Sequence, residues 1–282
     1  MTPDNISFLG YACGLAAGDA GCADGPVELQ SEFKTISLLY PDIFCKDKYK
    51  IIAELSQRLA ERVQQSVYDK KPFIVFAGDH SCAIGTWSGA TSALEKDVGL
   101  IWVDAHLDAH TTETSPSGNI HGMPVASLLG HGNNLLSSIL DVRPKIKPEN
   151  MCFIGVRSFE EGEFELVTRL GIKVFYIDEV KSRGLDGVFK EAKTIVTKNT
   201  PYYGVSIDLD GIDPSEAPGV GTPEKNGLSS QELCDALTKY CHRDPKLIGV
   251  EITEFNPHHD VSGKTREVIR NLVKSIYTIG EK

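Results

Sequence analysis

The sequence lacks several features that define large classes of proteins, beginning with paired cysteines. It contains no C-x-x-C pair, and its seven cysteines are scattered over 282 residues. Because seven is an odd number, at least one thiol is free. Scattered thiols are more typical of a reducing compartment than of a disulfide framework, so we expect a cytoplasmic protein.

Positive charge is also scarce. The sequence has 29 Lys and Arg residues against 39 Asp and Glu residues, a formal net charge of −10. A nucleic-acid or anionic-membrane partner requires a basic face, so we expect neither. No apolar run is long enough to span a bilayer. Asp4, rather than a basic residue, precedes the first apolar stretch, so we expect a strand over 7–11 and not a secretory signal.

Several motifs of nucleotide-binding and hydrolytic proteins are missing as well. There is no GxxxxGK[ST] and no GxGxxG opening a helix, and neither HExxH nor GxSxG occurs. These absences argue against a phosphate-cradling loop, a zincin site and a serine nucleophile on a sharp turn.

The sequence does contain an almost continuous alternation of strand-like and helix-like segments. Continuous apolar runs are typical of strands covered on both faces, as in a parallel sheet between helices. We therefore predict one three-layer α/β/α domain over 1–282, with a mostly parallel central sheet. Strands are expected at 7–11, 73–77, 98–103, 151–156, 172–177, 202–207 and 246–252. Helices are expected at 47–68, 159–170, 185–197, 229–242 and 262–278, and the small residues of 81–94 suit a helix packed tightly on the sheet.

Acidic residues and histidines follow three of these apolar runs. His80 comes after the strand at 73–77, and Asp104, His106 and Asp108 come after that at 98–103. Asp208 and Asp210 end the strand at 202–207. An i, i+2, i+4 spacing in an extended chain points side chains the same way. In a parallel sheet the functional site belongs at the carboxyl ends of the strands, where all these residues are expected to lie.

A cluster of like charges needs a counter-charge, and no Lys or Arg lies within either acidic segment. A single DxD at a strand end is often only a turn or a helix N-cap. Three clusters, each ending a buried strand, favour divalent metal instead. Carboxylates with some imidazole suit Mn²⁺ or a similar ion, and six candidate ligands suit two ions sharing one hydroxide.

Two further residues are candidates for chemistry. His121, between Ile120 and Met123, would move protons if it lies near the attacking hydroxide, or would merely cap a loop. Glu254, after the strand at 246–252, would suit a cationic substrate if it binds no metal, or would be a surface residue before a turn.

Together, the motifs of this sequence resemble those of the ureohydrolase family, which includes arginase and agmatinase. They are GDHS (78–81), DAHLDAH (104–110), SGNIHGMP (117–124), SIDLDGIDPSEAPGVGTP (206–223) and EITEFNP (251–257). They occur in order along nearly the whole chain, and SGNIHGMP is similar to arginase more than to agmatinase.

The resemblance implies an arginase-like fold with two Mn²⁺ ions, and a homo-oligomer, either a trimer or a hexamer. It assigns one ion to His80, Asp104, Asp108 and Asp208, and the other to His106, Asp104, Asp208 and Asp210, so that Asp104 and Asp208 bridge. It makes His121 the proton shuttle and Glu254 the residue that holds the guanidinium group. Asp108 would pass a proton to the leaving amine.

The resemblance also assigns substrate binding to His110, Ser115, Ser117, Glu160 and Thr222. Ser117 matches the family pattern, whereas the sequence departs from it at several neighbouring positions. His110 stands where arginases carry Asn beside the substrate carboxylate. Glu160 replaces an Asp that helps to bind the α-amino group, and Ser158 replaces another Asp. Ser115 replaces Thr but keeps the hydroxyl, and Ala77 replaces Gly beside a metal ligand.

We therefore expect a manganese-dependent hydrolase that converts L-arginine and water to L-ornithine and urea. His110 and Glu160 keep open a relative acting on another guanidino or formimino substrate, such as an agmatinase, guanidinobutyrase or formiminoglutamase. An inactive metal-binding protein is a more remote alternative, against which His121 and Glu254 argue because neither is needed to hold metal. A two-metal phosphoesterase is weaker still, since no Arg or Lys clamp lies near the acidic segments.

Overall fold

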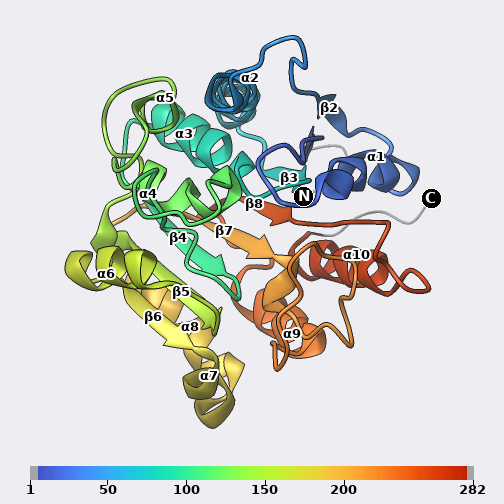
Figure 1. The fold of residues 1–282 in the computed structure, drawn as a ribbon. Helices are drawn as coiled ribbons and strands as arrows, with labels where there is room; N and C mark the ends of the chain where they lie inside the picture. Colours follow the sequence, from blue (N-terminus) through green and yellow to red (C-terminus); the bar gives the residue numbers. More distant parts are fainter. Residues whose placement is uncertain (1–5, 278–282) are drawn as a thin grey trace.

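Eight strands form one sheet with helices on both faces in the computed structural model, which describes residues 6–277 (Figure 1). Every neighbouring pair of strands is parallel. The predicted three-layer α/β/α architecture is confirmed, and the sheet order is β2-β1-β3-β8-β7-β4-β5-β6. The strands are β1 (Ser7–Tyr11), β2 (Ser37–Leu39), β3 (Phe73–Ala77), β4 (Val98–Val103), β5 (Met151–Val156), β6 (Lys173–Tyr176), β7 (Tyr202–Asp208) and β8 (Leu247–Thr253).

The longer helices follow the predicted ranges closely. They are α2 (Lys48–Tyr68), α3 (Cys82–Leu94), α6 (Glu161–Leu170), α8 (Leu185–Val196), α9 (Ser230–Tyr240) and α10 (Lys264–Ile276). Shorter ones are α1 (Gly25–Glu28), α4 (Pro124–Leu128), α5 (Asn134–Ser137) and α7 (Ile177–Arg183). Residue 278, the expected end of the last helix, lies outside the described residues. The strand expected at 172–177 is shorter, because Ile177 already begins α7.

The apolar stripes of the helices explain how they cover the sheet. In α2, Asp47 caps the first turn by accepting from the backbone N–H groups of Tyr49 and Lys50. Leu55 and Leu59, one turn apart, are buried. This is the spacing that places apolar residues on one helix face. In the part of the chain described, no helix has the length and hydrophobicity that crossing a membrane requires.

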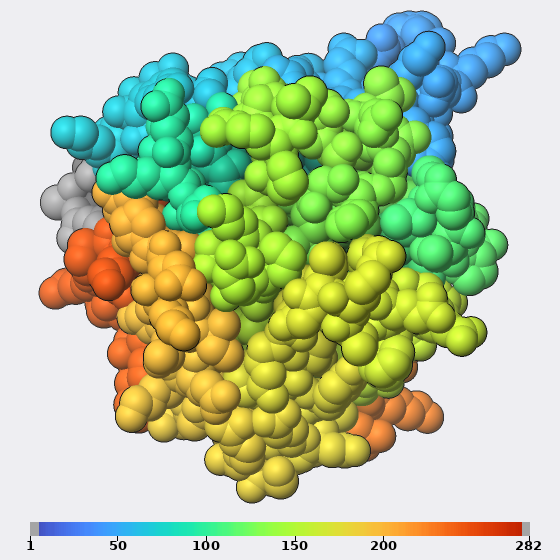
Figure 2. All heavy atoms as spheres, turned by 90° about the vertical axis from the view of Figure 1, so that its left-hand side faces the viewer, coloured from blue at the N-terminus to red at the C-terminus, as the bar shows by residue number. Residues whose placement is uncertain are grey.

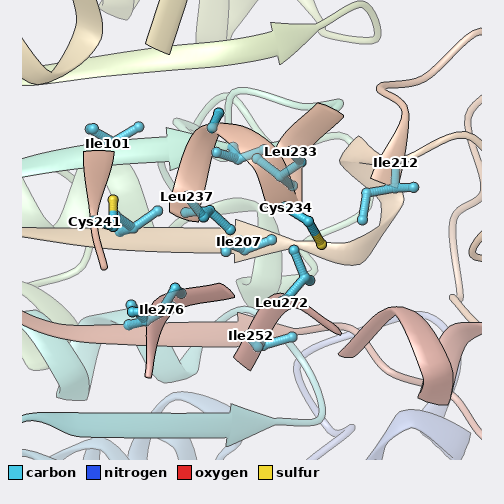
Figure 3. Packing of buried hydrophobic residues seen from close by; sticks show 14 of the residues in the cluster. Ile101, Ile207, Ile212, Leu233, Cys234, Leu237, Cys241, Ile252, Leu272 and Ile276 are labelled. Atoms are coloured by element: carbon cyan, nitrogen blue, oxygen red, sulfur yellow. The ribbon is translucent and has the colours of Figure 1, made fainter. Parts of the chain in front are cut away.

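The two faces of the sheet carry separate hydrophobic cores. Helices α8, α9 and α10 cover one face, where residues of three strands meet side chains of α9 and α10 (Figure 3). Helices α2, α3, α4 and α6 cover the other face. From the side of α5 and α6, the chain forms one continuous surface from its blue to its orange segments (Figure 2). The cysteines form no disulfide, and all but Cys45 are buried.

Candidate metal centre

Four neighbouring strands at the middle of the sheet end with polar side chains at one edge. In sheet order they are β3, β8, β7 and β4. His80 follows β3, Glu254 follows β8, Asp208 ends β7 and Asp104 follows β4. Residues far apart in the sequence are therefore neighbours in space, as expected for the carboxyl ends of parallel strands.

His80 lies at the centre of the first group of candidate ligands. Its Nδ1 atom is 2.9 Å from Asp208 Oδ2, 3.1 Å from Asp108 Oδ2 and 3.4 Å from Asp104 Oδ2. His80 Nδ1 is buried but has no hydrogen-bond partner of acceptable geometry among the described residues. One nitrogen and three carboxylate oxygens thus converge on the same space.

A second group adjoins the first and shares Asp104 with it. His106 Nδ1 is 3.2 Å from Asp210 Oδ2 and 3.4 Å from Asp104 Oδ1. All six predicted metal ligands therefore belong to one of two adjoining groups. Asp208, predicted to bridge, is gathered with the first group, where its Oδ2 atom faces His80. Its bridging role stays a prediction.

The backbone brings these side chains together by turning, not by staying extended as we expected from the i, i+2, i+4 spacing. The backbone N–H of His106 donates to Asp104 Oδ1 at 2.7 Å. Asp108 adopts a positive φ of 47°, which is uncommon for a residue with a side chain. Likewise Asp208 accepts from the N–H of Asp210 at 2.9 Å and caps a short 3-10 helix. The carboxylates thus also shape the loops that carry them.

The charges of the cluster are not balanced by the protein itself. Burial, and next the charge of Asp104, raises the pKa of Asp108 to about 7. Burial and the charge of Asp210 also raise the pKa of Asp208 well above its ordinary value. Burial opposes protonation of His80, yet the nearby carboxylates of Asp104, Asp108 and Asp208 raise its pKa well above the usual range. Without cations, the site would take up protons instead.

Two observations indicate that these residues suit divalent cations. The first is the unpartnered Nδ1 of His80, which faces three carboxylate oxygens and can serve as a ligand. The second is the donor set, in which oxygen predominates over imidazole nitrogen and no thiolate takes part. Such a donor set suits Mn²⁺ or a similar ion better than it suits structural Zn²⁺, which is usually bound by thiolates.

His121 and Glu254 form a pair beside the first group. His121 Nδ1 lies 3.1 Å from Glu254 Oε1, and the same oxygen accepts from the backbone N–H of His80 at 2.8 Å. Burial disfavours the charged imidazole, but Glu254 outweighs this effect and the pKa of His121 rises to about 9. Glu254 itself is buried and adopts a positive φ of 65°. The structure thus brings both predicted residues to the same edge as the metal ligands.

A pocket of about 290 Å³ opens above the metal centre. Its lining includes all five residues predicted to bind substrate, namely His110, Ser115, Ser117, Glu160 and Thr222. It also includes His121, Glu254 and four of the predicted metal ligands, and no Lys or Arg of residues 6–277 lines it. Thr222 Oγ1 donates to Asp210 Oδ2 at 3.1 Å, which connects the pocket wall to the second group.

His110 and Glu160, two of the departures from the family pattern, contact each other. His110 Nε2 is hydrogen-bonded to Glu160 Oε2 and lies 3.5 Å from Glu163 Oε2. His110 and Glu163 are buried, whereas Glu160 is exposed. This contact could not be predicted from the sequence, because the two partners lie 50 residues apart.

Sequence reasoning missed several residues that organise the site. Arg157 donates to the carbonyl oxygens of Gly155, Asp210, Gly211, Glu224 and Lys225, and so fixes the loop after β7. Asp79 accepts from the N–H of Ala16 and holds the loop after β1 against the site. Arg157 directly precedes Ser158, and Asp79 lies within the GDHS motif, but neither position indicates its partners in the fold.

Comparisons with known proteins agree with this geometry. A model of the arginase family matches residues 4–278. The arginase of Bacillus caldovelox is 43% identical over 233 residues, which cover 83% of this chain and 77% of that protein. The crystal structure of Bacillus subtilis arginase has a TM-score of 0.86 at 36% identity, with 99% of both chains covered. The Entamoeba histolytica arginase in complex with L-ornithine has a TM-score of 0.90 at 27% identity, covering 99% of this chain and 100% of that one.

Proposed function

The chain belongs to the arginase family of hydrolases, and we propose that it cleaves L-arginine to L-ornithine and urea with two Mn²⁺ ions as cofactor. The observation that carries this proposal is the meeting of the two ligand groups with the His121–Glu254 pair at the floor of one pocket. The arginase names of the relatives and the ornithine in the Entamoeba histolytica structure support the choice of substrate.

The metal ligands would be His80, Asp104, Asp108 and Asp208 for one ion, and His106, Asp104, Asp208 and Asp210 for the other. The chemistry that two such bound cations supply is the acidification of water, so that hydroxide is present at neutral pH. The protein's part is to assemble buried carboxylates that would repel one another without that charge.

The remaining residues of the floor bind the substrate and move protons. The Glu254 carboxylate is fixed by the N–H of His80, so it can pair with the guanidinium group and orient its central carbon. Asp108 lines the pocket and is placed to carry a proton to the leaving amine. His121, partly exposed at the pocket wall, would exchange protons with solvent.

At the amino-acid end of the pocket, we propose that His110 and Glu160 contact the α-carboxylate and the α-amino group. Ser115 and Ser117 stabilise the loop there, because their hydroxyl oxygens accept from the N–H groups of Gly118 and Asn119 at 3.0 and 3.2 Å. Thr222 is the remaining polar contact of the wall.

Initial rates of urea release test the proposal. The protein is loaded with Mn²⁺ and given L-arginine, agmatine or guanidinobutyrate, and in parallel formiminoglutamate, from which formamide is measured instead of urea. We expect kcat/KM for L-arginine to exceed that for agmatine by at least about 100-fold, because agmatine leaves the polar contacts for the carboxylate unpaired. A preference for another member of the panel would contradict L-arginine as the substrate. Release of neither urea from the guanidino compounds nor formamide from formiminoglutamate would contradict a hydrolytic function.

Assembly and location are predicted from the family and from the cysteines. We propose a homo-oligomer, either a trimer or a hexamer, whose mass light scattering would measure. A reducing compartment such as the cytoplasm is our prediction for its location, because the thiols are unpaired in this fold.

A further inference from the structure

Three aromatic side chains gather at the mouth of the pocket above the metal centre. Phe159 follows β5, Phe164 lies in α6 and Tyr176 ends β6. The ring of Phe159 stacks on that of Phe164, with centroids 5.7 Å apart and 19° between the planes. The ring of Phe159 also lies 5.7 Å from that of Tyr176. We call these three residues the aromatic rim.

Two members of the aromatic rim are open to solvent. Phe159 is 41% exposed and Phe164 is 42% exposed, although their rings already stack on each other. Exposed apolar side chains that adjoin one another, unlike scattered ones, mark a surface that binds another molecule. The proposed hydrolysis of L-arginine gives neither phenylalanine a role, so the ligand of this surface has to be sought elsewhere.

The pocket itself is buried at its floor and open at its mouth. Asp108 and Glu254 at the floor are buried, whereas Ser117, Phe159 and Glu160 of the same lining are exposed. A substrate whose guanidinium group lies at the floor therefore has its α-carbon near the mouth. A group attached to the α-nitrogen would pass out of the pocket there and would meet the aromatic rim.

A second hollow, of about 570 Å³, lies on the other side of the aromatic rim. Phe159 lines the pocket and Phe164 lines the hollow, so the stacked pair of rings joins the two. His110 Nδ1 of the pocket is likewise 3.1 Å from Thr114 Oγ1 of the hollow. Phe164 and Leu166 give the hollow apolar surface. A side chain that crosses the rim can therefore be covered on more than one side.

We propose that the aromatic rim and the hollow form a second subsite, and that the protein also hydrolyses arginine as the C-terminal residue of a dipeptide whose first residue is apolar. The inference rests on the proposed function, because the guanidinium group of the dipeptide is cleaved at the same floor. The peptide N–H can donate to Glu160 in place of the α-ammonium group, and the free carboxylate keeps its contact with His110.

The reaction is the proposed hydrolysis with the peptide bond left intact. Water adds to the guanidinium carbon, and the bond from that carbon to Nε breaks. The Nε atom takes up the proton that water loses and leaves as the side-chain amine of ornithine. The products of Leu-Arg and one water molecule are therefore Leu-Orn and urea.

Urea release from Leu-Arg and Gly-Arg by the Mn²⁺-loaded protein tests this subsite. Mass spectrometry has to show intact Leu-Orn, which excludes a contaminating peptidase that frees arginine first. We expect kcat/KM for Leu-Arg to exceed that for Gly-Arg by about 10-fold, because only the leucine side chain loses apolar surface to the rim and the hollow.

Phe159→Ala and Phe164→Ala each remove one exposed ring. In either variant we expect the Leu-Arg to Gly-Arg ratio of kcat/KM to fall to about 2 or less. Because the ratio compares two substrates of the same protein, a general loss of activity does not change it. Phe44→Ala is the matched control, since Phe44 is 91% exposed but lines neither the pocket nor the hollow. It should leave the ratio at about 10.

Equal kcat/KM for the two dipeptides would overturn the proposal, and so would a ratio that survives both Phe159→Ala and Phe164→Ala. Turnover of L-arginine without turnover of either dipeptide would overturn it as well and leave the proposed function standing. If Phe159→Ala also had a smaller mass in light scattering, the rim would be a contact between copies of the chain.

Failure of the proposed function gives a different result, in which L-arginine is not hydrolysed either. Hydrolysis of the dipeptides then fails with it, and calorimetric titration with Leu-Orn and Gly-Orn decides the subsite alone. Tighter binding of Leu-Orn that is lost in Phe159→Ala would support the subsite. Equal affinities of the two ornithine dipeptides would overturn it.

Discussion

At the scale of single residues, the pairing of His121 with Glu254 predicts a measurable pH dependence. Burial lowers the pKa of His121, but Glu254 raises it to about 9, above the ordinary value of 6.5. A group whose pKa is raised on folding stabilises the fold below its unfolded pKa. That stabilisation is lost as the pH rises through the folded pKa. Glu254→Gln should therefore destabilise the ion-free protein at pH 6 and much less at pH 10.

Urea unfolding at both pH values measures this difference, and an NMR titration of His121 should show its pKa falling toward the ordinary value in Glu254→Gln. Glu165→Gln is the matched control, since Glu165 is exposed in α6. Glu165→Gln should change the free energy of unfolding by no more than the few tenths of a kcal/mol typical of surface changes, and it should leave the pKa of His121 unchanged. A destabilisation of Glu254→Gln that is equal at pH 6 and pH 10 would contradict the pairing.

The residues that the sequence identified and those that it missed differ in where they stand in a strand. His80, Asp104 and Asp208 come at or just beyond the end of an apolar run, so their position at the sheet edge follows from the pattern. Glu251 and Ser206 lie inside such runs, where a single polar residue gives no sign of its partner. Ser206 contacts His80, and Glu251 contacts Cys82 and Trp87 of α3. One sequence does not show which segment lies beside a given strand.

At the scale of elements, α3 shows a helix whose packing the sequence predicted only in part. Its small residues suggested tight contact with the sheet, but Gly85 and Gly89 face α2 instead. A methyl group on Gly89 would lie 2.3 Å from the carbonyl oxygen of Ala60. The sheet is met by Trp87, whose ring occupies the space above Gly204. Small residues therefore marked a close contact correctly but not its partner.

Gly89→Ala should destabilise the protein, although alanine favours helices. Replacing glycine in a helix gains about 1 kcal/mol, whereas overpacking against backbone costs about 1–3 kcal/mol. We expect a net loss of up to about 2 kcal/mol in the free energy of unfolding. Gly187→Ala in α8 is the control, because a methyl group there meets nothing within 4 Å. It should stabilise by up to about 1 kcal/mol. Equal effects of both substitutions in urea unfolding would contradict the close contact of α2 with α3.

The elements that the sequence missed are short ones. β2 has three residues at the sheet edge, and α7 follows β6 without a connecting loop. Neither β2 nor α7 is long enough for a pattern of apolar residues to repeat, so hydrophobic periodicity does not reveal these two elements. The long elements, α2 and α10 among them, were predicted within a few residues, because their apolar stripes repeat over several turns.

At the scale of the whole molecule, strand order decides the function. The sequence predicts parallel strands with acidic ends, but not that β3, β8, β7 and β4 lie next to one another. That order brings His80 within 3.4 Å of carboxylates that follow it by 24 to 128 residues. The fold thereby concentrates buried negative charge at one edge, and the stability of the entire chain depends on what neutralises it.

Metal removal should expose this dependence through pH. Burial raises the pKa of Asp108 to about 7 and that of Asp79 to about 6, both from an ordinary value of 3.8. At pH values between the ordinary pKa and the raised pKa of these carboxyls, the ion-free folded protein binds more protons than the unfolded chain. The stability of the ion-free protein therefore falls as the pH rises from about 4 to 7. A cation bound by Asp108 displaces the proton of that carboxyl, so the loaded protein escapes that part of the loss.

The difference in Tm between Mn²⁺-loaded and EDTA-treated protein should therefore widen from pH 5.5 to pH 8. At a free Mn²⁺ concentration 100 times Kd, each site adds about 2.7 kcal/mol to the free energy of unfolding, which corresponds to several degrees. Calorimetry at three pH values measures the difference, and Asp208→Asn, with one shared ligand removed, should reduce it. If the difference in Tm between loaded and EDTA-treated protein stayed constant or narrowed toward pH 8, protons would not compete with cations for the carboxylates at the ends of the central strands. The acidic cluster would then owe its stability to the fold alone.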